Sequence, residues 1–229
     1  MSALGNSNRT NKTYLSIVNG KIAQRVKPET PNAVKRFSEK AQKEFHELLY
    51  DYITGKIVAM ELSLSDYGEE LKIDIENNGL YQLQIPVDSR FFETFANRLS
   101  KADLNKEIRI IPYSFKDEKD KTRSGVNLFH KNDAGVFNVK IEPLYTKDNQ
   151  GNIPPFPNNP VPSEQKEDIK VWRIQVLRIY KKIINQHIEI LKQLFPETQT
   201  PPSDNVPTYH SPGTPPPANS DDDSDDLPF

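Results

Sequence analysis

The sequence of 229 residues contains no cysteine, which excludes disulfides, zinc ribbons, iron–sulfur ligation and a cysteine nucleophile. The four histidines are scattered along the chain and give little support to a histidine metal site. No hydrophobic run reaches the ~18 residues of a membrane span, and the polar first residues lack the apolar core of a signal peptide. We therefore expect a cytoplasmic protein with no cofactor and no metal.

Motifs of common enzyme classes are missing as well. Gly20-Lys21 and Gly55-Lys56 lack the upstream glycine and the following Ser or Thr of a phosphate-binding loop, and neither G-x-S-x-G nor H-E-x-x-H occurs. Asp74 and Glu76 fall on one face of a predicted strand and could hold Mg²⁺ as nuclease carboxylates do, although a solvated strand face explains them more simply. We expect a protein that is not an enzyme, with a metal-dependent nuclease as an alternative.

Basic residues are absent from the C-terminal end of the chain. Residues 196–229 contain no Lys or Arg but hold seven acidic residues. Removing these seven from the total of 32 leaves 25 acidic against 30 basic residues in the remainder, a net charge of about +5. The formal net charge of −2 therefore conceals a basic body joined to an acidic tail. Such asymmetry favours nucleic-acid binding.

Composition and periodicity divide the chain into five parts. Residues 196–229 form a Pro-, Ser- and Thr-rich linker with an acidic tip, which has too little apolar surface to offset its ordering entropy, so we expect disorder. The other parts are a disordered N-terminus at 1–12, a body at 13–148, a proline-rich loop at 149–164 and a helix at 165–195.

The helix is predicted from apolar residues at three- and four-residue steps. Ser163 is its expected N-cap, and Pro196 ends it. The apolar stripe consists of Ile169, Trp172, Val176, Ile179, Ile183, Ile190 and Leu194. This stripe suits packing on the body or on a second protomer, so a homo-oligomer is an open alternative.

The body alternates apolar and polar residues in the manner of β-strands. The predicted strands are 56–64, 69–76, 80–86, 107–115, 121–130 and 134–141, preceded by a hairpin of 14–18 and 22–26 around Asn19-Gly20. Strand 56–64 is expected to place Val58, Met60, Leu62 and Leu64 on one face. A short helix capped by Asp88 carries Phe91, Phe92, Phe95 and Leu99 between the third and fourth of these strands.

The order of three strands, a helix and two strands is typical of the OB-fold, a five-stranded Greek-key barrel. The predicted fold class is therefore mainly β: an OB-fold with an extra N-terminal hairpin, a long C-terminal helix and a disordered acidic tail. An unrelated β-rich barrel or sandwich is the alternative.

A protein that binds single strands needs cations for phosphates and flat side chains for bases. If Val126 and Leu128 face the core, the other face of their strand presents cations, an amide and an aromatic ring. The preceding strand, the basic segment 21–43 and the loop 116–123 add further cations and rings. The candidate DNA-binding residues are Lys21, Arg25, Lys27, Lys35, Arg36, Phe37, Arg109, Tyr113, Phe115, Lys119, Lys121, Arg123, Asn127 and Phe129. Core packing or a solvated loop is the alternative for these positions.

The last residues, DDDSDDLPF, resemble the C-terminal tip of bacterial single-stranded-DNA-binding proteins. In that family a barrel holds DNA and the tip recruits replication, recombination and repair proteins. The resemblance implies that the ring of Phe229 enters an apolar pocket of a partner, that Pro228 pre-sets the backbone and that the aspartates meet a basic rim. The implied partner-binding residues are Asp221, Asp222, Asp223, Asp225, Asp226, Leu227, Pro228 and Phe229. A solubilising or autoinhibitory tail is the alternative.

The blocks LKIDIENNGLYQLQIPVDSRFFETFANRL and RSGVNLF look more like phage-encoded single-stranded-DNA-binding proteins, which combine a decorated barrel with an acidic tail. This likeness implies a viral protein that coats single-stranded DNA during replication, recombination and repair in a bacterial host cell. A protein-binding OB-fold adaptor remains an alternative.

Overall fold

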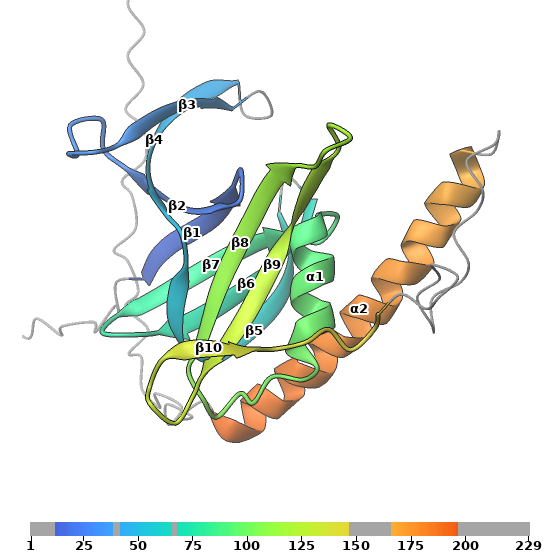
Figure 1. Ribbon diagram of the computed structural model, residues 1–229. Coiled ribbons are helices and arrows are strands. Elements are labelled where there is room, and N and C mark those ends of the chain that lie inside the picture. The colour runs from blue at the N-terminus through green and yellow to red at the C-terminus, as the bar shows by residue number, and fades with distance from the viewer. Residues whose placement is uncertain (1–11, 39–41, 66–67, 147–165, 197–229) are drawn as a thin grey trace, which may run out of the picture. The chain divides into compact units, whose positions relative to one another are not determined.

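The computed structural model describes residues 12–38, 42–65, 68–146 and 166–196, with side chains of the last range described from residue 170 onward. Nearly all of the predicted N-terminal segment, the proline-rich loop and the tail with its tip lie outside these ranges. The strands are β1 (Lys12–Val18), β2 (Lys21–Val26), β3 (Val34–Ser38), β4 (Lys43–Tyr50), β5 (Ile53–Ser65), β6 (Gly68–Glu76), β7 (Leu80–Pro86), β8 (Ile108–Lys116), β9 (Thr122–Lys131) and β10 (Phe137–Lys140). The helices are α1 (Arg90–Leu99) and α2 (Lys166–Leu194) (Figure 1).

The described part of the chain is mainly β, as predicted, with a C-terminal helix. The ten strands form one open sheet in the order β10-β9-β8-β5-β6-β7-β1-β2-β4-β3. The predicted order of three strands, a helix and two strands appears as β5-β6-β7-α1-β8-β9. A closed barrel of these five strands needs β7 to pair with β9, and among the described residues it does not. The expected closed five-stranded barrel therefore differs from the open sheet observed.

Both edges that closure would use are occupied by other segments. The edge of β7 pairs in parallel with β1, where Leu15 lies opposite Leu83. The edge of β9 pairs with β10 at residues 129–131 and faces α1 at Val126, whose amide donates to Thr94 Oγ1 at 2.8 Å and whose carbonyl accepts from Arg98 Nε at 3.0 Å. Side chains of α1 and the strand β10 thus satisfy backbone groups on the β9 edge that a barrel partner would otherwise bind.

The core lies between the inner face of this sheet and the two helices. Leu71, Ile73 and Ile75 of β6 are buried, as their alternation predicts. In β5 the predicted face is confirmed at Met60 and Leu62, which pair with the buried Ile73 and Leu71, and is wrong at Val58 and at the exposed Leu64. A β-bulge separates Ile57, opposite Ile75, from the next paired residue of β5, so the side-chain alternation changes phase. Ile57 and Met60 are buried, Val58 and Leu62 are half-buried, and Leu64 is exposed.

Helix α1 begins one residue later than Asp88 predicts. Its N-cap is Ser89, whose hydroxyl accepts from the amide of Phe92 at 3.2 Å. Phe92, Phe95 and Leu99 are fully buried, which confirms the predicted apolar face of this helix.

Helix α2 packs within the same chain, against α1 and β5. Its buried stripe is rotated from the predicted one, because Tyr180 and Leu191 are buried while Ile190 and Leu194 are exposed. The buried members are Val176, Tyr180, Ile183, Ile184, His187 and Leu191. Within the described residues, neither helix is long and apolar enough to cross a membrane.

The predicted N-terminal hairpin is confirmed, and its turn is packed against β8. Asn19 and Gly20 both have positive φ, 48° and 75°, as a two-residue hairpin turn requires. A Cβ on Gly20 would lie 2.6 Å from the carbonyl carbon of Tyr113 and against the amide of Ser114. Only glycine permits this approach, which positions β1 and β2 beside the face of the sheet that carries the candidate site.

Candidate nucleic-acid interface

The outer face of β8 and β9 carries six of the predicted binding residues. Val126 and Leu128 are fully buried, so the alternate residues of β9 point away from the core, as expected. The strand register places Arg109 opposite Phe129 and Phe115 opposite Arg123. The six residues that share this face are Arg109, Tyr113, Phe115, Arg123, Asn127 and Phe129.

The clearest stacking surface on this face is a pair of aromatic rings. The ring of Phe115 is 56% exposed, although an exposed phenyl ring loses hydrophobic stabilisation. The ring centroid of Tyr113 lies 6.0 Å from it, with an angle of 35° between the ring planes. Arg123, opposite Phe115, is also exposed and pairs with Asp117 at 2.8 Å. An aromatic pair beside a cation is suited to bases and phosphates of a single strand.

Arg109 lies at the other end of the same face, between two rings that the sequence did not single out. Its guanidinium carbon is 4.2 Å from the ring centroid of Tyr52 and 4.5 Å from that of Phe137. Its Nε also donates to Thr54 Oγ1 at 3.2 Å. These contacts fix the guanidinium plane and leave Phe129, opposite Arg109, half-buried. The two rings come from outside β8 and β9, so the pattern of those strands contains no signal for them.

The loop between β8 and β9 is ordered by Asp117. Its Oδ1 accepts from the amides of Lys119 at 3.0 Å and Lys121 at 2.9 Å. The hydrogen bond from the Lys121 amide is the main cause that lowers the pKa of Asp117, and Arg123 adds to it. The side chains of Lys119 and Lys121 are exposed, and neither forms an ion pair with another described residue. The loop thus presents two available cations.

The described residues of the basic segment 21–43 include parts of three strands, of which only the first, at 22–26, was predicted. These strands are β2, β3 and the start of β4, and the register divides their residues between two faces. Arg25 and Arg36 share the outer face, whereas Lys35 and Phe37 lie on the opposite face of β3. The remaining predicted DNA-binding residues of this segment are Lys21 and Lys27, which are both exposed. Lys21 pairs with Asp51.

Arg36 is committed to a structural ion pair. Its Nε and Nη2 donate to the two carboxylate oxygens of Glu47 at 2.8 and 2.7 Å. Glu47 is buried, and the hydrogen bond to it raises the pKa of Arg36. Because its two donors are taken by a buried carboxylate, Arg36 is the least available of the predicted cations.

Phe45 is a functional candidate that the sequence reasoning missed. Three cations lie near its ring, with Arg25 at 4.0 Å, Lys43 at 5.4 Å and Arg36 at 5.8 Å from the centroid. Arg25 and Lys43 form no ion pair with another described residue. The available signal was the alternation of Lys43, Phe45 and Glu47 on one strand face, since such spacing brings cation and ring together.

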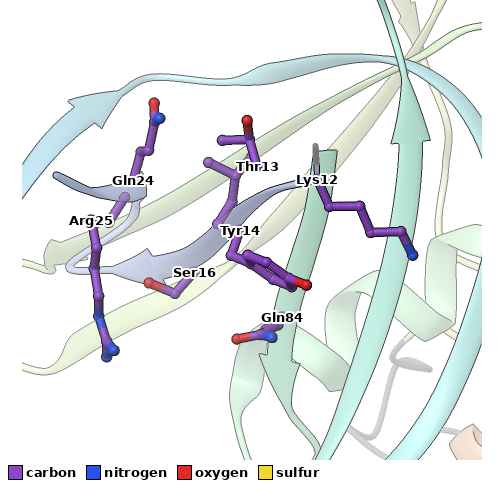
Figure 2. A pocket seen from close by; sticks show the side chains of 9 residues that line it. Lys12, Thr13, Tyr14, Ser16, Gln24, Arg25 and Gln84 are labelled. Carbon is purple, nitrogen blue, oxygen red and sulfur yellow. The ribbon is translucent and has the colours of Figure 1, made fainter. Parts of the chain in front are cut away.

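A groove of about 590 Å³ lies beside this cluster, over β7, β1 and β2. Figure 2 shows Tyr14, Ser16, Arg25 and Gln84 on one side of the hairpin, with Thr13 and Gln24 directed to the other. Its lining residues are Lys12, Thr13, Tyr14, Leu15, Ser16, Ala23, Gln24, Arg25 and Gln84. Only Arg25 belongs to the predicted binding set.

The proposed nuclease carboxylates lie on the same outer face. Asp74 Oδ2 accepts from Lys12 Nζ at 2.7 Å, and Asp74 Oδ1 accepts from Gln82 Nε2 at 2.8 Å. Both oxygens of this carboxylate are therefore engaged. The part of the chain that the structure describes contains no group of three or more His, Asp or Glu side chains arranged to hold a metal ion.

Comparisons of the chain with protein-family models, with curated proteins and with solved structures found no match.

Proposed function

We propose that this chain is a single-stranded-DNA-binding protein that coats exposed strands during replication, recombination and repair. The observation that carries the proposal is the outer face of β8 and β9. It presents the exposed ring of Phe115, the adjacent ring of Tyr113 and the cation of Arg123, with the lysines of the 117–121 loop beside them. Rings stack on any base, and cations displace the counterions of any phosphate, so this chemistry binds single strands of any sequence.

The proposed architecture is an OB-fold opened by the N-terminal hairpin. The strands β5-β6-β7, the helix α1 and the strands β8-β9 follow the order of that fold. The pairing of β1 with β7 and the cover of α1 on the β9 edge are the features that we propose replace barrel closure. Oligonucleotides bind OB-folds on the face of the second and third strands, here β6 and β7, and on loops that include the one between the last two strands, here loop 117–121.

The tip at residues 221–229 is proposed to recruit replication, recombination and repair proteins. Its support is the sequence alone, an acidic run followed by Leu-Pro-Phe. A short anchor on a long polar tether binds weakly but reaches many partners.

The direct test is fluorescence anisotropy of a labelled oligo(dT) titrated with the full chain at several salt concentrations, with and without Mg²⁺. We expect affinity for oligo(dT) to exceed affinity for a duplex of equal length. The logarithm of the binding constant should fall by about 0.7 per neutralised phosphate for each unit of log salt. Salt-independent binding or duplex preference would contradict the proposal, and loss of intact strand on adding Mg²⁺ would support the nuclease instead.

A further inference from the structure

The groove over β7, β1 and β2 holds chemistry that the proposed face on β8 and β9 does not use. We propose that this groove binds one nucleotide unit of single-stranded DNA, with its base on Tyr14 and its phosphate at Arg25 and Lys43. This inference rests on the proposed function and adds a second contact surface to it.

Strand register places a ring, an amide and a cation in one row across the sheet. Tyr14 pairs with Gln82 of β7. Leu15 lies opposite Gln24, so Tyr14 and Arg25 meet one position further along, on the outer face. Neighbouring strands are about 4.8 Å apart, so this row across the three strands β7, β1 and β2 is about as long as one nucleotide.

The next row explains why the surface is hollow. Ser16 pairs with Gln84 on one side and with Ala23 on the other. The short side chains of Ser16 and Ala23 leave a floor beside the row of the larger Tyr14 and Arg25. Figure 2 shows the ring of Tyr14 directed toward Gln84 at the side of this floor.

Tyr14 and Gln84 provide a stacking surface and hydrogen-bonding groups for a base. The ring of Tyr14 is 60% exposed. The side-chain amide of Gln84 forms no hydrogen bond with another side chain or with the backbone in the described part of the chain. An amide has both donors and an acceptor, so it can bind the edge of any base that stacks on the adjacent ring.

The phosphate site follows from the charges around Phe45. Arg36 is neutralised by Glu47, whereas Arg25 and Lys43 have no carboxylate partner among the described residues. The ring holds the guanidinium of Arg25 at 4.0 Å and leaves its N–H edges available, which is the geometry that suits a phosphate.

The other end of the groove is electrically neutral. Lys12 is paired with Asp74 at 2.7 Å, so it offers no uncompensated charge. The electrostatic potential rises from this neutral pair to the positive charge of Arg25. This difference orients the nucleotide, with its phosphate toward β2 and β4 and its base toward β7.

The test compares full-length Tyr14→Ala and Tyr14→Phe with the wild type, by anisotropy of labelled oligo(dT). Loss of one stacked base weakens binding about 5- to 150-fold, so Tyr14→Ala should fall in this range while Tyr14→Phe stays near wild type. Leu64→Ala is the control. Leu64 is an exposed apolar residue at the end of β5 and does not line the groove, so its loss should leave affinity unchanged.

The phosphate contact has a separate readout. Replacing both Arg25 and Lys43 by Ala should reduce the magnitude of the log–log salt slope by about 0.7, because the neutralisation of one phosphate is lost. Lys192→Ala, on the exposed surface of α2, should leave the slope unchanged.

The outcomes separate this inference from the proposed function. If the wild type binds oligo(dT) and Tyr14→Ala binds as tightly, the groove is not a base site although the proposed function survives. If the wild type itself fails to bind oligo(dT), both are wrong. Photo-crosslinking with an oligonucleotide that contains 5-iododeoxyuridine should label the peptide with Tyr14, and adducts confined to other peptides would overturn the groove assignment.

Discussion

Arg36 of β3 and Glu47 of β4 form a two-point ion pair, at 2.8 and 2.7 Å, in which the carboxylate is only 1% exposed. Removing the guanidinium would leave a buried charge with no partner. We expect Arg36→Ala to lower the free energy of unfolding by about 3 kcal/mol, measured by urea denaturation.

The neighbouring residue supplies the control for this prediction. Lys35 pairs with Glu44 at 2.9 Å, but both side chains are more than half exposed. Such surface pairs contribute at most about 1 kcal/mol, so Lys35→Ala should change stability little. Equal losses in the two variants would show that the Arg36–Glu47 pair has no special structural role.

Gly20 provides a test of how the hairpin is positioned. With φ of 75° and the backbone of β8 in contact, alanine meets both backbone strain and a steric clash. Gly135 has a similar φ of 79° but open space around it. We expect Gly135→Ala to cost about 1 kcal/mol from strain alone, and Gly20→Ala to cost clearly more in the same urea titration. Similar costs would mean that the approach to β8 relaxes easily.

The sequence predicted most elements of this fold because their signals are local. Alternation located β6 and β9 with their inner faces, and Asn19-Gly20 located the first hairpin. The open sheet was not predictable in the same way, since the contact of Thr94 with the β9 edge is a tertiary interaction without a sequence period. The bulge between Ile57 and Ala59 likewise removed Val58 from the face that strict alternation had assigned to it.

The candidate site shows the same division. The outward face of β8 and β9 follows from the burial of Val126 and Leu128, which alternation predicts. Alternation along the strands could not predict the contacts of Tyr52 and Phe137, because these rings reach Arg109 from segments that are distant in the sequence. Composition also counted Arg36 as an available cation, whereas its partner Glu47 becomes adjacent only when β3 pairs with β4.

Phe115 is the predicted stacking residue on β8. We expect Phe115→Ala to weaken oligo(dT) binding about 5- to 150-fold, because one ring–base contact is lost, and Phe115→Tyr to bind nearly as the wild type does. Leu64→Ala is the control, since Leu64 is an exposed apolar residue at the end of β5. Anisotropy titration at fixed salt measures all three. An unchanged affinity in Phe115→Ala would remove this ring from the interface.

Asp117 should make the order of the loop depend on pH. Its pKa in the folded chain lies below the ordinary value of 3.8, so its charged form stabilises the loop at pH above that value. This stabilisation is lost as the pH falls through the lowered pKa of the folded form. The amide resonances of Lys119 and Lys121, followed by NMR, should shift in that acidic range. In Asp117→Asn the same amides should show no such transition, and a transition that persisted there would assign the effect to another group.

The five aspartates of the tip should compete with DNA for the basic faces of the body. Asparagine at all five positions keeps the length of the tail and removes its charge. We expect this variant to bind oligo(dT) more tightly than the wild type at low salt and equally at high salt, because screening shortens the range of the competition. Phe229→Ala keeps the charge and should bind DNA as the wild type does. Anisotropy at two salt concentrations distinguishes these variants. Weaker binding in the asparagine variant would mean that the tail contributes to the DNA site rather than opposing it.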